Sequence, residues 1–298
     1  HQTVEAQLRL QGGHFPILGR CFAFLELQNR LTGQTAHITV PLFAAHGVWE
    51  GRCALTTDYC GQLRLSLTRV FLLDLFGAVP ISRRPGAQAL VTVLPDTFQL
   101  RLPSALRACG APEGEPSGRR GQDLTELRQL RAYEPGDDVR GIHWKLTAKY
   151  GMPLFREPSQ PVSQSLLLFW DPEQAGPSQA DALAGALFSV CQALCEDGIP
   201  FTLAFTRDAA LQLEPIADLD ALTQCLPLIL RCPGGDWTLP RPDFGTTLRF
   251  AAVPCPEEGG LFQLLCTSAP SDHAHALCFT PEDCAEALQN LDVAYEEN

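Results

Sequence analysis

Residues 131–149 read RAYEPGDDVRGIHWKLTAK and bring acids, bases and aromatic rings together in one short segment. The Pro135-Gly136 dipeptide is typical of a turn, and the acids after it can cap the element that follows. Apolar residues such as Val139, Ile142 and Leu146 are threaded through the segment, which argues against a solvated run of charges. We therefore predict an interlocked loop, in which carboxylates pair with arginines and arginine stems pack on rings.

The run Tyr133-Glu-Pro-Gly-Asp-Asp-Val-Arg140, followed by Ile142-His-Trp-Lys145 and Thr147-Ala148, resembles the signature of the bacterial family called domain of unknown function 58 (DUF58). That signature reads roughly Tyr-x-Pro-Gly-Asp-x-x-Arg-x-Ile-x-Trp-x-x-Thr/Ser-Ala and ends on Arg-Glu, as Pro153-Leu-Phe-Arg-Glu157 does here. A weaker second match is Asp74-Leu75-Phe76-Gly77, where the family usually has Asp-Pro-Phe-Gly. The family has no established molecular function, so the resemblance implies an architecture and not a reaction.

The signature residues are expected to have a structural or interaction role. We predict that Asp137 or Asp138 pairs with an arginine and that Trp144 is mostly buried. The residues concerned are Arg131, Tyr133, Pro135, Gly136, Asp137, Asp138, Arg140, Trp144, Lys145 and Arg156.

Residues 1–102 consist of short apolar segments separated by turn signals. Val4, Ala6, Leu8 and Leu10 alternate with polar residues, and further runs of strand length lie at 21–27, 36–40, 52–56, 63–67 and 89–94. Short strands with no helical period favour an antiparallel β-sandwich or a small barrel. The DUF58 resemblance also implies an immunoglobulin-like sandwich here, so we predict a first domain at residues 1–102.

Residues 103–164 are predicted to form a linker followed by the signature segment. Residues 103–122 are rich in proline and glycine and include Arg119-Arg120, a composition typical of a mobile linker or an exposed loop.

Residues 165–298 alternate between apolar strands and amphipathic helices. We expect strands at 165–170, 201–206, 210–213, 261–267 and 277–280, and helices at 180–196, 219–230 (bent or displaced at Pro227) and 284–291. This alternation predicts an α/β sheet covered on both faces. The DUF58 resemblance implies that this domain is von Willebrand factor A-like, that is, Rossmann-like.

Such a domain binds a divalent cation where Asp-x-Ser-x-Ser follows its first strand, because a carboxylate and hydroxyls make a hard oxygen site. Here the strand is followed by Asp171-Pro-Glu-Gln-Ala175, which keeps only the aspartate. We predict no metal and no cofactor, and expect local N–H groups to satisfy Asp171. The residues that could still build such a site are Asp171, Asp272 and a hydroxyl from Thr246 or Thr247.

Two other groups of chemically active residues have a structural interpretation that we prefer. His273, His275, Cys278 and Cys284 do not match a standard zinc spacing. His143 beside Asp137 and Asp138 resembles a base held by a carboxylate, but the chain has no nucleophile motif and no Walker-type loop.

A net charge of −12 argues against nucleic acid as the main partner and against adhesion to anionic lipid by charge. The twelve cysteines are scattered and none forms Cys-x-x-Cys, so we predict free thiols and a reducing compartment. The chain starts at His1 without a signal peptide, which suggests a soluble fragment. Members of the resembled family commonly carry two transmembrane helices ahead of this region, which implies a place on the cytoplasmic face of the inner or plasma membrane.

Two functions remain open. The first is a non-enzymatic, membrane-tethered scaffold or adaptor that binds other proteins, because DUF58 genes are associated with MoxR-type AAA+ ATPases and von Willebrand A proteins. The alternative is a hydrolase or transferase that uses Asp137, Asp138 and His143 in a cleft between domains. The sequence does not indicate an oligomeric state.

Overall fold

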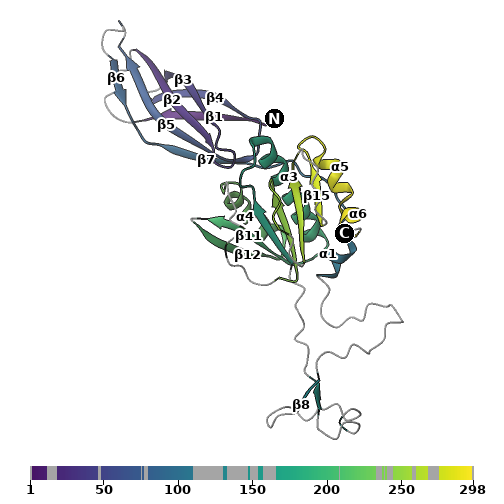
Figure 1. The fold of residues 1–298 in the computed structure, drawn as a ribbon. Coiled ribbons are helices and arrows are strands. Elements are labelled where there is room, and N and C mark those ends of the chain that lie inside the picture. Colours follow the sequence, from purple (N-terminus) through teal and green to yellow (C-terminus); the bar gives the residue numbers. More distant parts are fainter. Residues whose placement is uncertain are drawn as a thin grey trace. The chain divides into compact units, whose positions relative to one another are not determined.

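The computed structural model describes residues 2–11, 19–45, 48–74, 76, 80–109, 130–132, 147, 154–156, 166–207, 209–232, 237, 239, 244–256, 260–267 and 275–296. The chain divides into two compact units. Residues His1–Gly110 and Ser165–Asn298 form the first unit, and Ala111–Gln164 form the second (Figure 1). Among the described residues, no helix is long and apolar enough to cross a membrane.

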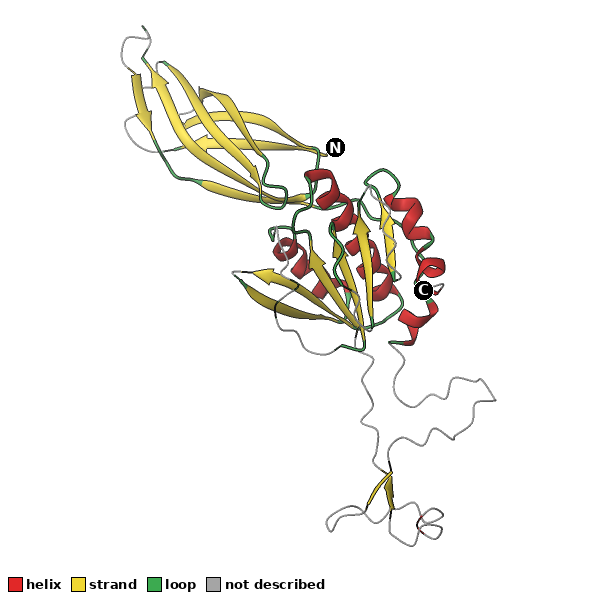
Figure 2. Cartoon of the chain, viewed as in Figure 1, coloured by secondary structure: helices red, strands yellow, loops and turns green. Residues whose placement is uncertain are grey.

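The N-terminal part of the first unit is an antiparallel β module (Figure 2). Its strands are β1 (Gln2–Leu10), β2 (Arg20–Asn29), β3 (Thr35–Ala45), β4 (Val48–Thr57), β5 (Gly61–Leu73), β6 (Pro80–Arg83) and β7 (Gln88–Val93). Their order is β1-β4-β3-β2-β5-β6, and β7 also pairs with β5. The antiparallel strands predicted from alternation are therefore confirmed.

The larger of two apolar clusters holds β2 to β5 together, and a smaller one consists of Leu27, Leu63 and Val93. Strand β3 pairs with β2 through Leu42 and with β4 from Phe43 onward, so it links two groups of strands. In β2 every second residue is buried, as expected for a strand with one face on a core. The core residues come from four strands and include Ala23, Leu25, Val40, Leu42, Trp49, Val70 and Leu72.

The C-terminal part of the first unit is an α/β module with a six-stranded sheet of order β12-β11-β10-β13-β14-β15. Its strands are β10 (Leu166–Asp171), β11 (Phe201–Arg207), β12 (Ala210–Ile216), β13 (Thr246–Ala251), β14 (Leu261–Cys266) and β15 (Ala276–Phe279). Only β12 runs antiparallel to its neighbour. Strand β13, at the centre of this sheet, was not predicted from the sequence.

The helices of this module are α3 (Pro177–Glu196), α4 (Leu219–Ile229), α5 (Cys284–Gln289) and α6 (Leu291–Glu296). Helix α3 lies where apolar periodicity placed a helix and ends at Asp197 and Gly198, whose φ of 69° suits glycine. Proline 227 lies inside α4, as expected. The helix predicted at 284–291 corresponds to α5, whose C-cap is Asn290, and α6 follows it as a helix that was not predicted.

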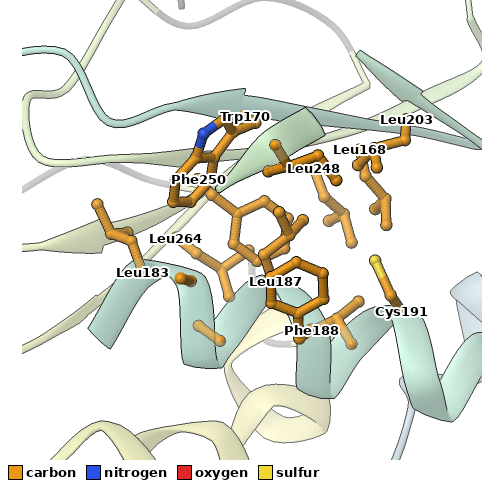
Figure 3. Packing of buried hydrophobic residues seen from close by; sticks show 14 of the residues in the cluster. Leu168, Trp170, Leu183, Leu187, Phe188, Cys191, Leu203, Leu248, Phe250 and Leu264 are labelled. Atoms are coloured by element: carbon orange, nitrogen blue, oxygen red, sulfur yellow. The ribbon is translucent and has the colours of Figure 1, made fainter. Parts of the chain in front are cut away.

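The main core lies between one face of the sheet and these helices. Figure 3 shows Leu183, Leu187 and Cys191 of α3 against sheet residues such as Leu168 and Phe250. The opposite face carries Leu167, Phe169 and Ala204, which pack with Leu211, Trp237 and Phe244. Within the described ranges no helix contributes to that second cluster. The central strands β10 and β14 are buried along their whole length, so both faces of the sheet are covered there as predicted. Among the described residues, helices cover one face only, and Leu211, Trp237 and Phe244 pack on the other.

The segment expected to be a linker begins with an ordered helix, α1 (Ser104–Ala108). Leu102 and Leu106 are 4% and 0% exposed and belong to the main core. The backbone N–H of Phe98 donates to Ser189 Oγ at 2.9 Å. The linker interpretation is wrong for residues 104–108, because apolar burial against the α/β module outweighs the proline- and glycine-rich composition nearby.

Polar contacts join the two modules within the first unit. The backbone N–H of Cys60 donates to Asp181 Oδ1 at 2.6 Å, and that of Gln62 donates to the Leu230 carbonyl at 3.0 Å. Leu31 and Cys60, from the β module, are also buried in the main core. Both hydrogen bonds and buried apolar side chains therefore hold the β module against the α/β module.

In the second unit, β8 (Leu130–Ala132) pairs antiparallel with β9 (Leu154–Arg156). The register places Leu130 opposite Arg156 and Arg131 opposite Phe155. The two ends of the signature segment are thus neighbours in a small two-stranded ladder.

Candidate functional site

The carboxyl end of β10 carries Asp171, the residue singled out as a possible cation ligand. All six residues of β10 are buried, so this carboxylate ends a strand with no exposed face. Asp171 alternates with Leu167 and Phe169 onto the face opposite the main core. The Asp171 carboxylate therefore lies in a buried region, where a charge without a partner would destabilise the folded state.

Arg249 of β13 supplies the opposite charge. It lies opposite Phe169 in the parallel register, two positions before the residue opposite Asp171, and points to the same face. Its Nε lies 2.9 Å from Asp171 Oδ2, and its Nη2 also donates to that oxygen. The two side chains are only 7% and 4% exposed, so the ion pair is almost completely shielded from water.

The remaining donors of Arg249 are used within the same cluster. Its Nη1 donates to the Val253 carbonyl at 2.8 Å and to Gln263 Oε1 at 3.0 Å. Gln263, which is 2% exposed, exchanges two further hydrogen bonds with the backbone of Cys255, at 3.0 and 3.1 Å. A buried charge pair is stable only when its remaining polar atoms are also paired, and these contacts meet that requirement.

An aromatic ring closes one side of this polar cluster. Arg249 Cζ lies 5.4 Å from the centroid of the Trp237 ring, within the range of a cation–π interaction. Trp237 in turn meets Phe169 edge-on, with ring centroids 4.9 Å apart. The guanidinium group is therefore held between a carboxylate, an amide and an aromatic face.

Burial raises the pKa of the Asp171 carboxyl, while Arg249 and the backbone N–H of Glu173 act in the opposite direction. The expectation that local N–H groups satisfy Asp171 is only partly correct. Glu173 contributes one such group, but the principal partner is a side chain from another strand. Sequence reasoning missed Arg249 and Gln263, although each is a polar residue inside an apolar run, TTLRFA and LFQLLC.

Thr246 and Thr247 were expected to lie near Asp171, and that expectation is wrong. They begin β13, where Thr246 is opposite Leu166, whereas Asp171 is opposite Ala251. Parallel strands start at the same edge, so the threonines lie about 13–17 Å along the strand from the Asp171 end. Thr246 instead accepts a hydrogen bond from Cys109 Sγ at 3.7 Å.

The other candidate ligands do not gather into a site. Cys284 Sγ donates to the Ala182 carbonyl at 3.6 Å, and burial raises its pKa to about 12. None of the twelve cysteines forms a disulfide bond. Among the residues with described positions, no group of three or more His, Cys, Asp or Glu could hold a metal ion.

Most of the predicted signature residues lie outside the described residues. Arg131 and Arg156 lie in the β8–β9 ladder. The others are Tyr133, Pro135, Gly136, Asp137, Asp138, Arg140, His143, Trp144 and Lys145, and Asp272 and His273 are likewise not described. The pairing of Asp137 or Asp138 with an arginine, the burial of Trp144 and the catalytic alternative therefore stay predictions.

Comparison with known proteins supports the resemblance carried by the signature. The family described as "Protein of unknown function DUF58" matches residues 129–181, which include the signature, β10 and the first turn of α3. No curated protein and no solved structure matches the chain. The match supports the DUF58 family for this segment.

Proposed function

We propose that this chain is a non-enzymatic scaffold or adaptor that binds other proteins, and that its α/β module is von Willebrand factor A-like but works without a metal ion. One observation carries the proposal: Arg249 occupies the charge-balancing position beside Asp171. In a cation-dependent site, that aspartate must offer an oxygen to the ion and leave a coordination position for the partner. Here Oδ2 already accepts two hydrogen bonds from a buried guanidinium group.

The sheet order is compatible with this proposal. Strand β10 is central and lies between β11 and β13, so Asp171 is at the carboxyl edge, where ligands of open α/β sheets commonly bind. At that edge the guanidinium group of Arg249 balances the charge of Asp171, so no metal ion from solution is needed for this purpose. Partner binding would then use surfaces other than this edge.

A MoxR-type AAA+ ATPase is the proposed partner, with von Willebrand A proteins as further members of the assembly. The DUF58 match at residues 129–181 supports this choice through the resemblance to that family. We place the assembly on the cytoplasmic face of the membrane, with the chain tethered by a preceding transmembrane hairpin.

The test is to mix the chain with a purified MoxR-type ATPase and to measure molar mass by size-exclusion chromatography with light scattering. A complex is expected both in Mg²⁺ and in EDTA without nucleotide, because the chain's own binding does not depend on a cation. The matched control is the ATPase with bovine serum albumin at the same concentration. Separate elution at tens of micromolar of each protein, or a complex that EDTA dissolves, contradicts the proposal.

A further inference from the structure

The outer face of the β module carries a groove that is basic, although the chain as a whole is acidic. Its volume is about 540 Å³, and β2, β3 and β5 contribute to it. The residues that line it are Phe24, Leu25, His37, Ile38, Thr39, Thr68, Arg69 and Arg84. The groove therefore offers two arginines and a histidine but no acid, on a chain with a net charge of −12.

A β-bulge shapes this groove. Phe24 is opposite Arg69 and Leu25 is opposite Leu67, so Thr68 is the extra residue in β5. The Thr68 hydroxyl donates to the Phe24 carbonyl at 3.0 Å and fixes the irregular position. Bulges redirect neighbouring side chains and recur beside binding sites. Here the bulge leaves Arg69 directly opposite Phe24 in the pairing of β5 with β2.

The groove combines an apolar surface with exposed cationic groups. Phe24 is 37% exposed, which is unusual for a phenylalanine in a central strand, whereas Leu25 is 2% exposed. Arg69 and Arg84 are exposed, and no hydrogen bond or ion pair to another described residue engages either guanidinium group. An exposed ring beside exposed arginines is the composition of protein-recognition surfaces, in which aromatic residues and arginine are enriched.

The charge on the two sides of the groove is not equal. His37 is opposite Glu26 in the β2–β3 register, so an acid lies next to the imidazole on that side. On the other side, Arg69 is opposite Phe24, and the paired residues of β5 and β6 next to Arg69 and Arg84 include no acid. Recognition of an anion therefore falls to the two arginines, whose planar groups bind carboxylates in a bidentate manner.

We infer that this groove binds an acidic peptide segment of a partner protein, with an apolar side chain on Phe24 and a neighbouring carboxylate between Arg69 and Arg84. The inference rests on the proposed adaptor function and gives the chemistry of the partner. A peptide suits the site because it supplies an apolar side chain and a carboxylate at adjacent positions along one strand. The overall negative charge of the chain disfavours nucleic acid at the same place.

The experiment measures fluorescence anisotropy of a labelled peptide that alternates aspartate with phenylalanine and leucine. Its two counterparts carry lysine or serine in place of aspartate. The chain is expected to bind the aspartate peptide at micromolar concentrations, at least tenfold more tightly than the others, and less tightly as salt rises from 50 to 500 mM. Arg69→Glu/Arg84→Glu should weaken binding more than tenfold.

Arg52→Glu is the matched control, since Arg52 is an exposed arginine of the same module, on β4, outside the groove. It should leave peptide binding within twofold of the parent chain, and circular dichroism establishes that each variant is folded. Equal binding of the three peptides, or an unchanged affinity for Arg69→Glu/Arg84→Glu, overturns the inference. Binding of inorganic phosphate without binding of the peptide also overturns it, because the groove would then serve a small anion.

Measuring both complex formation with the MoxR-type ATPase and binding of the acidic peptide distinguishes failure of this inference from failure of the proposed function. A chain that forms the complex but binds no acidic peptide refutes the groove and leaves the adaptor function standing. A chain that binds the acidic peptide through Arg69 and Arg84 but forms no complex supports the groove and refutes that partner.

Discussion

Replacing Arg249 with methionine should destabilise the chain strongly, because the substitution leaves a buried carboxylate without its cation. Methionine is close to the arginine stem in length and shape, so the change removes charge and hydrogen bonds more than packing. Asp171 loses two hydrogen bonds, and the Val253 carbonyl and Gln263 Oε1 lose one each. Breaking a buried pair by removing one partner costs about 3–5 kcal/mol.

The loss of stability in Arg249→Met should depend on pH, because Asp171 is buried and would lose its cation. Burial raises the pKa of this carboxyl, and Arg249 is the main group that opposes the shift. Without Arg249, the folded state retains a proton that the unfolded state has released, over the range between the two pKa values. Stability then falls as pH rises through that range, so Arg249→Met should be destabilised less at pH 5 than at pH 8.

Urea unfolding followed by circular dichroism at both pH values measures this effect. Arg107→Met is the matched control, because Arg107 pairs with Asp197 at 3.3 Å on the surface, where the side chains are 55% and 43% exposed. An exposed pair of this kind contributes about 0–1 kcal/mol. The double variant Asp171→Asn/Arg249→Met removes both charges and should recover part of the lost stability. A change below about 1 kcal/mol for Arg249→Met, equal at both pH values, would refute the reasoning.

Local pattern was sufficient for most of the fold. Strict alternation predicted β1, and the apolar run that follows Ser165 predicted the buried strand β10. Helix α3 followed from its apolar spacing and its stop at Asp197-Gly198. In each case the signal lies within a single element, since one face or the whole strand is buried.

What failed depended on contacts distant in sequence. Strand β13 carries Arg249 in its interior, which makes the run look unlike a core strand until the partner on β10 is known. Leu106 is buried only because α1 packs on the main core, which its proline- and glycine-rich surroundings do not reveal. The candidate hydroxyls at Thr246 and Thr247 were misplaced for the same reason: their distance from Asp171 follows from strand register.

Three further predictions concern the module contact, the thiols and the metal question. Asp181→Asn should lower the free energy of unfolding by about 1–2 kcal/mol in urea, because the Cys60 N–H then loses a charged acceptor, whereas Asp220→Asn, at an exposed aspartate, should change it little. Burial raises the pKa of Cys266 and Cys284 to about 12, so these thiols ionise at lower pH in the unfolded state than in the folded state. Thermal stability should therefore fall as pH rises from about 9 toward 12, and it should fall less steeply for Cys266→Ala/Cys284→Ala. A stability profile that is flat over this range would contradict the thiol argument. Calorimetric titration with Mg²⁺ and Mn²⁺ up to 10 mM should give no saturable heat at the β10 edge. The reason is that Arg249 already donates twice to Asp171 Oδ2, and a hydrated cation would have to displace a guanidinium group that also binds Val253 and Gln263. Glu173→Ala serves as the control for weak surface binding, since Glu173 is exposed beside the same edge. Saturable binding that Asp171→Ala abolishes and Glu173→Ala retains would show that the cation outcompetes Arg249, and would restore a metal-dependent ligand site to this domain.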